Sequence, residues 1–189
     1  MDRAAAALAI EAFLRALGHP VESDRELAGT GARVAAFWLD ELLDGYRVDL
    51  DALFADAMPS REGAPLVTLD GSSTHVVCPH HLTVGAGEAS VMYLPGAKVA
   101  GLGAIEQLVD ACTHRLVLQE DAGEHVARAL VEKLGARGAA CVLSLQHGCL
   151  ELHGEKKVGA RVRTVSLAGS FAVEGPDRAL ALAALAGAR

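Results

Sequence analysis

The sequence predicts an α+β fold: a four-stranded antiparallel sheet with paired helices on one face, preceded by an N-terminal helical extension. Apolar residues recur at three- and four-residue spacing within residues 4–43 and again within residues 102–134, as in helices that pack on a core. Four segments of strand character surround the second helical region, two before it and two after it. This order favours a sheet that carries both helices on the same face.

The totals indicate one globular domain. The chain has 189 residues, of which 51% are hydrophobic and 22% charged. We expect an N-terminal helical part over residues 1–62, a core over 63–175 and a short C-terminal helix over 176–189.

The net charge of -7 argues against binding nucleic acid mainly through phosphates. No segment approaches the ~18 consecutive apolar residues that span a membrane, and no secretory signal is evident. We therefore predict a cytoplasmic protein with neither nucleic acid nor membrane as partner.

The N-terminal part should contain two helices and a connector. The first helix covers residues 4–17 and stops at Gly18, with Pro20 just beyond. The second is closed by Gly45. Its apolar positions at helical spacing are Val34, Phe37, Trp38, Leu42 and Leu43. Residues 46–64 have a mixed pattern that ends in Pro, Ser and Gly, which is typical of a connector.

The core should begin with two antiparallel strands, over residues 65–77 and 88–94. One helix starts at Leu102 and another ends before Gly135. Strand character returns over residues 139–152 and 160–171, and a short helix starts at about Asp177. A four-stranded open sheet leaves two exposed edges, which favours pairing with further copies of the chain.

Two histidine- and cysteine-rich clusters carry the chemistry. Cys78, Pro79, His80 and His81 follow the first strand, and His147, Gly148 and Cys149 lie near the end of the third. At the two-residue period of a strand, the side chains of His147 and Cys149 project from the same face, about 7 Å apart along the chain.

Zinc prefers thiolate and imidazole ligands, and catalytic zinc sites usually keep three protein ligands and a fourth position open to water. Cys78, His81 and Cys149 supply such a set. His80 and His147 would then stand beside the metal and exchange protons near neutral pH. A closed structural site is the alternative, with a fourth ligand from one of three further histidines. These are His75, His114 and His153.

A simpler interpretation applies to the remaining cysteines. Cys112 and Cys141 lie in apolar stretches without a neighbouring histidine of the cluster, so we expect buried thiols there. Short patterns such as C-x-x-H also occur by chance. On the residues alone, the cysteines and histidines of the two clusters could therefore be zinc ligands or simply buried side chains.

Several motifs resemble those of a known family, and the resemblance covers most of the chain. The order and spacing of CPHHL (78–82), YLP (93–95), GL (101–102), LQE (118–120), HGC (147–149) and GSF (169–171) resemble GTP cyclohydrolase I. The N-terminal helix, its Pro-containing turn and the RVA helix are similar to that family as well. The resemblance implies the tunnelling fold, in which pentamers form a barrel, two pentamers stack into a decamer, and active sites lie between subunits.

The resemblance also implies roles for individual residues. Zn²⁺ would be held by Cys78, His81 and Cys149, and protons would be moved by His80 and His147. Gln119 and Glu120 match the pair that holds the guanine, and Arg115 matches a family arginine. The implied reaction is hydrolytic opening of the imidazole ring of GTP, which gives 7,8-dihydroneopterin triphosphate and formate for pterin and tetrahydrofolate biosynthesis.

The triphosphate half of the site departs from the family. Gly103, Ala104 and Gln107 stand where the family has Ser, Lys and Arg, and His153 replaces another arginine. Pro79 replaces an acidic residue. A nearby basic run is a candidate replacement for the lost cations, and the alternative is a solvated strand face. The run comprises Lys156, Lys157, Arg161 and Arg163, and Lys157 is our candidate substrate contact.

Three hypotheses result. The first is a divergent GTP cyclohydrolase I with a rebuilt phosphate clamp. The second is a tunnelling-fold zinc enzyme that acts on a purine or pterin without the triphosphate. The third is a non-catalytic binding protein that keeps the metal for stability. Formate release from different guanine compounds distinguishes them.

Overall fold

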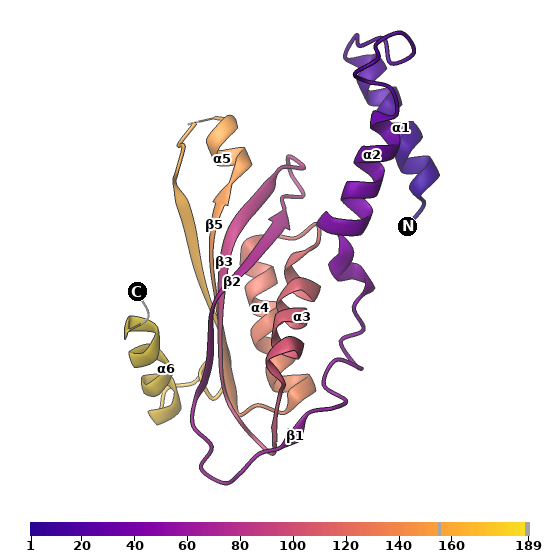
Figure 1. Cartoon of the computed structure of the whole chain (residues 1–189). Coiled ribbons are helices and arrows are strands. Elements are labelled where there is room, and N and C mark those ends of the chain that lie inside the picture. The colour runs from indigo at the N-terminus through magenta and orange to yellow at the C-terminus, as the bar shows by residue number, and fades with distance from the viewer. Residues whose placement is uncertain (155, 188–189) are drawn as a thin grey trace. The chain divides into compact units, whose positions relative to one another are not determined.

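The computed structural model describes residues 1–154 and 156–187. The chain forms two compact units, Met1–Asp44 and Gly45–Arg189 (Figure 1). The last two residues of the expected C-terminal segment 176–189 lie outside the described part. The expectation of one domain with a helical part over 1–62 stays a prediction.

The first unit is a pair of helices, as predicted. Helix α1 (Arg3–Ala16) begins at Asp2, whose side chain accepts a hydrogen bond from the backbone N–H of Ala5 at 3.0 Å. Helix α2 (Thr30–Phe37) continues as a π-helical turn, η1 (Trp38–Leu42). Glycine is required at position 31, because a Cβ there would lie 2.5 Å from the carbonyl oxygen of Ala7 in α1.

The second unit contains the predicted four-stranded sheet, in the order β2-β3-β5-β6 with every neighbouring pair antiparallel. Its strands are β2 (Val67–Val77), β3 (Val84–Leu94), β5 (Gly138–His147) and β6 (Arg161–Gly169). A small second sheet, in which β1 (Met58–Pro59) pairs with β4 (Lys98–Val99), was not predicted. A short 3-10 turn, η2 (Asp44–Arg47), precedes it.

Helices cover both faces of the sheet (Figure 1). The main core lies under α3 (Leu102–Thr113) and α4 (Gln119–Ala129), and α4 runs on into η3 (Leu130–Leu134). These are the predicted paired helices between the second and third long strands. Helix α6 (Pro176–Gly187) packs on the opposite face, over a smaller core around Met92 and Phe171.

A bulge in β2 keeps its apolar side chains on the helical face. The pairing with β3 shifts between Leu69 and Ser72, and Gly71 takes the left-handed conformation with φ 77°. One extra residue reverses the alternation of side chains. Leu69 before the bulge and Val76 after it therefore both face α3 and α4.

The prediction of a strand over residues 139–152 was wrong beyond His147. Strand β5 ends there, and Gly148–Leu152 form a short helix, α5. The two-residue strand period consequently does not relate His147 to Cys149. The helical turn directs Cys149 toward the turn that follows β2.

Candidate functional site

The CPHH segment forms a tight turn between β2 and β3. The backbone N–H of Cys78 donates to the carbonyl of Thr83 at 2.9 Å, and the N–H of Leu82 donates back to the carbonyl of Cys78 at 2.9 Å. Leu82 has a positive φ of 54°, which lets the chain reverse within the turn. Cys78 is buried at the base of this turn, whereas His80 and His81 are exposed at its tip.

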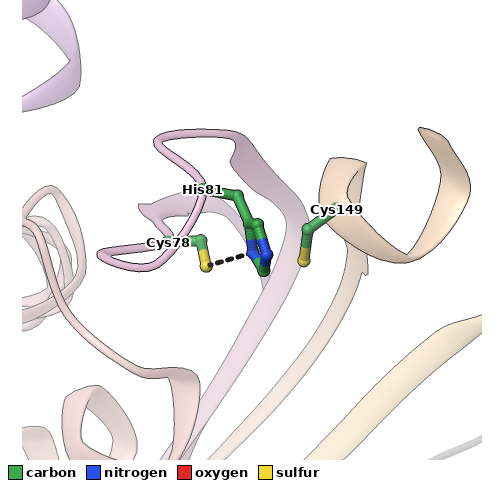
Figure 2. Close-up of side chains that lie close together, drawn as sticks. All are labelled: Cys78, His81 and Cys149. Atoms are coloured by element: carbon green, nitrogen blue, oxygen red, sulfur yellow. Dashed lines mark hydrogen bonds between the residues drawn. The ribbon is translucent and has the colours of Figure 1, made fainter. Parts of the chain in front are cut away.

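Cys78, His81 and Cys149 converge as predicted (Figure 2). Their ligand atoms all lie within 4.8 Å of one another, and Cys78 Sγ lies 3.8 Å from His81 Nδ1. Two ligand atoms of one tetrahedral zinc ion lie about 3.6 Å apart, given bonds of about 2.3 Å to sulfur and 2.0 Å to nitrogen. The three side chains therefore fit zinc in both donor type and spacing.

The other two thiols are unsuited to metal binding. Cys112 and Cys141 belong to the main core. Burial raises the pKa of Cys112 to about 11 and that of Cys141 to about 12, so both stay protonated at neutral pH. They are buried thiols, as the sequence analysis expected.

A short segment after α3 brings the guanine-binding candidates to the same place. The N–H of Val77 donates to the carbonyl of Arg115 at 3.0 Å, and the N–H of Val117 donates to the carbonyl of Val77 at 3.2 Å. This parallel pairing extends the edge of β2. Gln119 and Glu120 then start α4 immediately beside the turn that carries Cys78.

Gln119 is a buried residue that positions His147. Its Nε2 donates to the carbonyls of Leu143 and Val162, both at 3.0 Å, and to Thr164 Oγ1 at 3.1 Å. Since carbonyl oxygens only accept hydrogen bonds, the amide nitrogen must face them and Oε1 must face His147. His147 Nε2 lies 2.7 Å from this oxygen and is therefore the donor. The free basic nitrogen of the ring is Nδ1.

The site residues line a pocket of about 310 Å³. It is lined by Cys78, His80, Gln119, Glu120, His147 and Cys149 among the polar residues and by Val76, Val117, Leu118, Leu150 and Val162 among the apolar ones. Partial burial lowers the pKa of His147, and the charge of Glu120 opposes this effect. The ring is consequently neutral at pH 7 and able to accept a proton.

Arg115 and Lys157 lie outside this lining. The guanidinium of Arg115 donates to the carbonyls of Ala111 and Gly45, the latter at 2.9 Å, and covers the ring of Tyr46 at 4.8 Å. It fastens the end of α3 to the segment that follows Asp44. Lys157 is exposed, and its backbone N–H donates to the carbonyl of Leu150 at 2.9 Å.

Two other candidate cations, Arg161 and Arg163, lie on the sheet face opposite this pocket. Arg163 lines a separate hollow with Asp70 and Glu88, on the sheet face that carries α6. Arg161 shares that face because it lies two residues away on the same strand. Val162, between them, lines the metal-site pocket instead. Within one subunit, neither arginine replaces a phosphate contact at this pocket.

Comparison with known proteins assigns the family. The model of the family described as GTP cyclohydrolase I matches residues 6–186. The chain belongs to the GTP cyclohydrolase I family. A protein named GTP cyclohydrolase 1 from Mycobacterium leprae is 37% identical, over 96% of this chain and 88% of the relative. A protein of the same name from Chromobacterium violaceum is 38% identical, over 79% of this chain and 72% of the relative. One from Leifsonia xyli subsp. xyli is 37% identical over 90% and 89%.

The family assignment agrees with the observed architecture. An antiparallel sheet with α3 and α4 together on one face is the tunnelling-fold subunit that the motifs implied. Among solved structures, the apo form of the archaeosine synthase QueF-Like is similar with a TM-score of 0.46 and 22% identity, over 57% of this chain and 97% of that one. Within the described part of the chain, no helix is long and apolar enough to cross a membrane.

Gly85 is a site residue that the sequence analysis missed. It pairs with His147 across β3 and β5, and a Cβ on it would lie 2.7 Å from His147 Nδ1. The ring therefore rests against bare backbone. A glycine two residues before another in a strand of otherwise small residues was the available signal, since glycine in a strand often marks a close approach.

We expect Gly85→Ala to lower the rate of the family reaction about 100-fold while zinc stays bound. The added methyl group would displace the His147 ring, and a shift of about 1 Å in a catalytic group has effects of that size. The measurement is steady-state formate release together with metal content. Ala86→Ser is the control, because it also adds one heavy atom, to the exposed face of the same strand. A Gly85→Ala variant with the unmodified rate would contradict this role.

Proposed function

We propose that this chain is a zinc-dependent cyclohydrolase that opens the imidazole ring of a guanine nucleotide, converting GTP to 7,8-dihydroneopterin triphosphate and formate. One observation carries the proposal. Two thiols, a neutral imidazole and an exposed carboxylate border the same pocket, and a second imidazole, that of His81, has its ligand atom within 4.8 Å of both thiols. The names of the relatives support the same activity.

The metal would be held by Cys78, His81 and Cys149, whose fit to zinc is given above. Zinc in such a set supplies Lewis acidity and lowers the pKa of water toward ~7, which provides a nucleophile near neutral pH. Cys149 belongs to α5 and Cys78 to the turn after β2, so the metal would also join two segments that are distant in sequence.

His147 would transfer protons during ring opening. Gln119 fixes its tautomer, so the ring accepts a proton at Nδ1 while Nε2–H stays bonded to the amide oxygen. The lowered pKa keeps the ring in its basic form at neutral pH. Gln119 itself would be a positioning residue, because its polar atoms are engaged with His147, Leu143, Val162 and Thr164.

Glu120 would hold the guanine. It lies exposed in the first turn of α4 and borders the pocket. A carboxylate accepts two hydrogen bonds, one from the ring N–H and one from the exocyclic amine of guanine. His80 would be a second proton carrier, since it borders the same pocket with its ring 6.2 Å from that of His81.

The proposed site also requires more than one copy of the chain. Gly103, Ala104 and Gln107 lie in the first turns of α3, which starts shortly after the last residue of β3, whereas the CPHH turn with its metal-ligand candidates precedes the first residue of that strand. Strand β3 alone has 11 residues and so spans about 35 Å. These positions can reach the pocket only from a neighbouring subunit. We therefore propose a homo-oligomer, with pentameric rings joined through the outer strands β2 and β6 and two rings forming a decamer, acting in the cytoplasm.

A second candidate is a substrate with fewer phosphates. The hollow of about 290 Å³ beside the start of α3 has no lysine or arginine among its described lining residues, which include Asp56 and Gln107. Each missing charge-assisted contact to phosphate would cost about 1.5–3 kcal/mol. A pterin, or a guanine compound without the triphosphate, would suit this end of the site.

The test is to incubate the zinc-loaded protein separately with GTP, GMP and guanosine and to measure formate. We expect release from GTP, and none from protein treated with a chelator. Release from GMP or guanosine but not from GTP would favour the second candidate. A folded, zinc-containing protein that releases formate from none of the three would contradict an enzymatic role and favour a non-catalytic binding protein.

A further inference from the structure

One histidine beside the metal ligands has no part in the function proposed above. His153 follows the five-residue helix α5, and its backbone N–H donates to the carbonyl of Cys149 at 3.0 Å. This bond is one turn of helix, which places residues four apart on the same face. The ring of His153 lies against that of His81, with centroids 5.2 Å apart and planes tilted by 42°.

The four residues form two ligand pairs with familiar zinc spacing. Cys78 and His81 are separated by two residues, and Cys149 and His153 by three. Two thiolates and two imidazoles make a complete tetrahedral Cys₂His₂ set, with one pair from a turn and the other from a helix. The ligand atoms of Cys78, His81 and Cys149 already lie together, whereas that of His153 is outside this group and would join it by a turn of its side chain. With His153, the set would contain one more donor than a catalytic site keeps.

The other two histidines considered as a fourth ligand lie elsewhere. His75 and His114 stack on each other with ring centroids 3.8 Å apart, at β2 and at the end of α3. His114 Nε2 also lies 3.3 Å from a carboxylate oxygen of Asp110. Of the three, His153 is the one whose ring contacts a member of the metal cluster.

We propose that His153 is a displaceable fourth ligand, which completes the metal set in the resting protein and leaves it when substrate enters. The inference rests on the metal centre of the proposed function. Displacement is physically reasonable because His153 is exposed and caps a very short helix, and Gly154 follows with a positive φ of 61°. Cys78, by contrast, is buried at the base of its turn. The site would then be protected from stray ligands until a substrate competes for the metal.

The test uses Co²⁺ in place of zinc, because its visible absorption spectrum reports the ligand set. We expect the spectrum of His153→Ala to differ from that of the unmodified protein, and guanosine or GTP to shift the unmodified spectrum toward that of the variant. Zinc affinity, measured by competition with a chelator, should fall about 10- to 100-fold in His153→Ala. His125→Ala is the control, since His125 is an exposed histidine of α4 outside the pocket.

Identical spectra and equal zinc affinity in the variant and the unmodified protein would overturn the inference. Formate release separates this result from failure of the proposed function. If the protein releases formate but His153→Ala has the spectrum and zinc affinity of the unmodified protein, the enzymatic role is supported and His153 is not a ligand. A third result is also possible: His153→Ala changes the spectrum, but no guanine compound is turned over and none shifts the spectrum of the unmodified protein. The four-ligand site would then be permanent, and both displacement by substrate and the catalytic role would be wrong.

Discussion

His147→Ala is expected to lower formate release from GTP by about 10²- to 10⁴-fold, the usual contribution of a positioned general acid or base. The loss follows from the geometry: Gln119 fixes the tautomer of His147, and burial keeps its ring neutral. Zinc content should remain near that of the unmodified protein, because His147 is not among the converging ligand atoms. The measurement combines steady-state formate production with metal analysis.

His125→Ala serves as the matched control for this experiment. It removes an exposed imidazole from α4, so we expect the unmodified rate and metal content. If His147→Ala instead lost its zinc, His147 would be a ligand and the roles assigned here would be wrong. A rate within a few-fold of the unmodified protein would show that another group moves the proton.

Cys149→Ala is expected to weaken zinc binding by more than 100-fold and to abolish activity as a consequence. Even indirect partners of a metal ligand contribute about 10- to 100-fold to affinity, so removal of a direct thiolate ligand should cost more. Metal content after purification and chelator competition provide the measurement. The variant should also melt at a lower temperature than the zinc-loaded protein, because it loses the link between α5 and the turn after β2.

Cys112→Ala is the control for the loss of a thiol. Cys112 lies in the main core, and burial raises its pKa to about 11. Its replacement should lower stability through a small cavity while zinc stays bound. Full metal occupancy in Cys149→Ala would rule out ligation by that thiol. Metal loss in Cys112→Ala, with the fold intact, would show that the ligand set is misassigned.

Local patterns were sufficient to predict most of the fold. Helical spacing located α1, α3 and α4, and glycines with positive φ follow two helical segments as expected, at Gly18 and Gly135. The small sheet of β1 and β4 was missed, because each strand has only two residues and its pairing joins distant segments. The strand expected at Cys149 was wrong because strand patterns do not reveal where a chain turns helical.

The sequence by itself determined the donor atoms: two thiols and an imidazole in two short clusters, with further histidines beside them. Residue types decide what chemistry is available, and they are read without coordinates. The motifs also identified the family, and the comparison confirmed it.

Only the tertiary structure decided how those residues are used. It showed that Gln119 is occupied by His147 and backbone carbonyls, that Arg163 faces α6 rather than the pocket, and that His153 lies against His81. Alternation along a strand separates two sets of side chains, but which set faces the site depends on packing between segments far apart in the sequence. The same long-range packing brings Cys149 to Cys78, and for that reason the candidate metal ligands converge only in the folded chain.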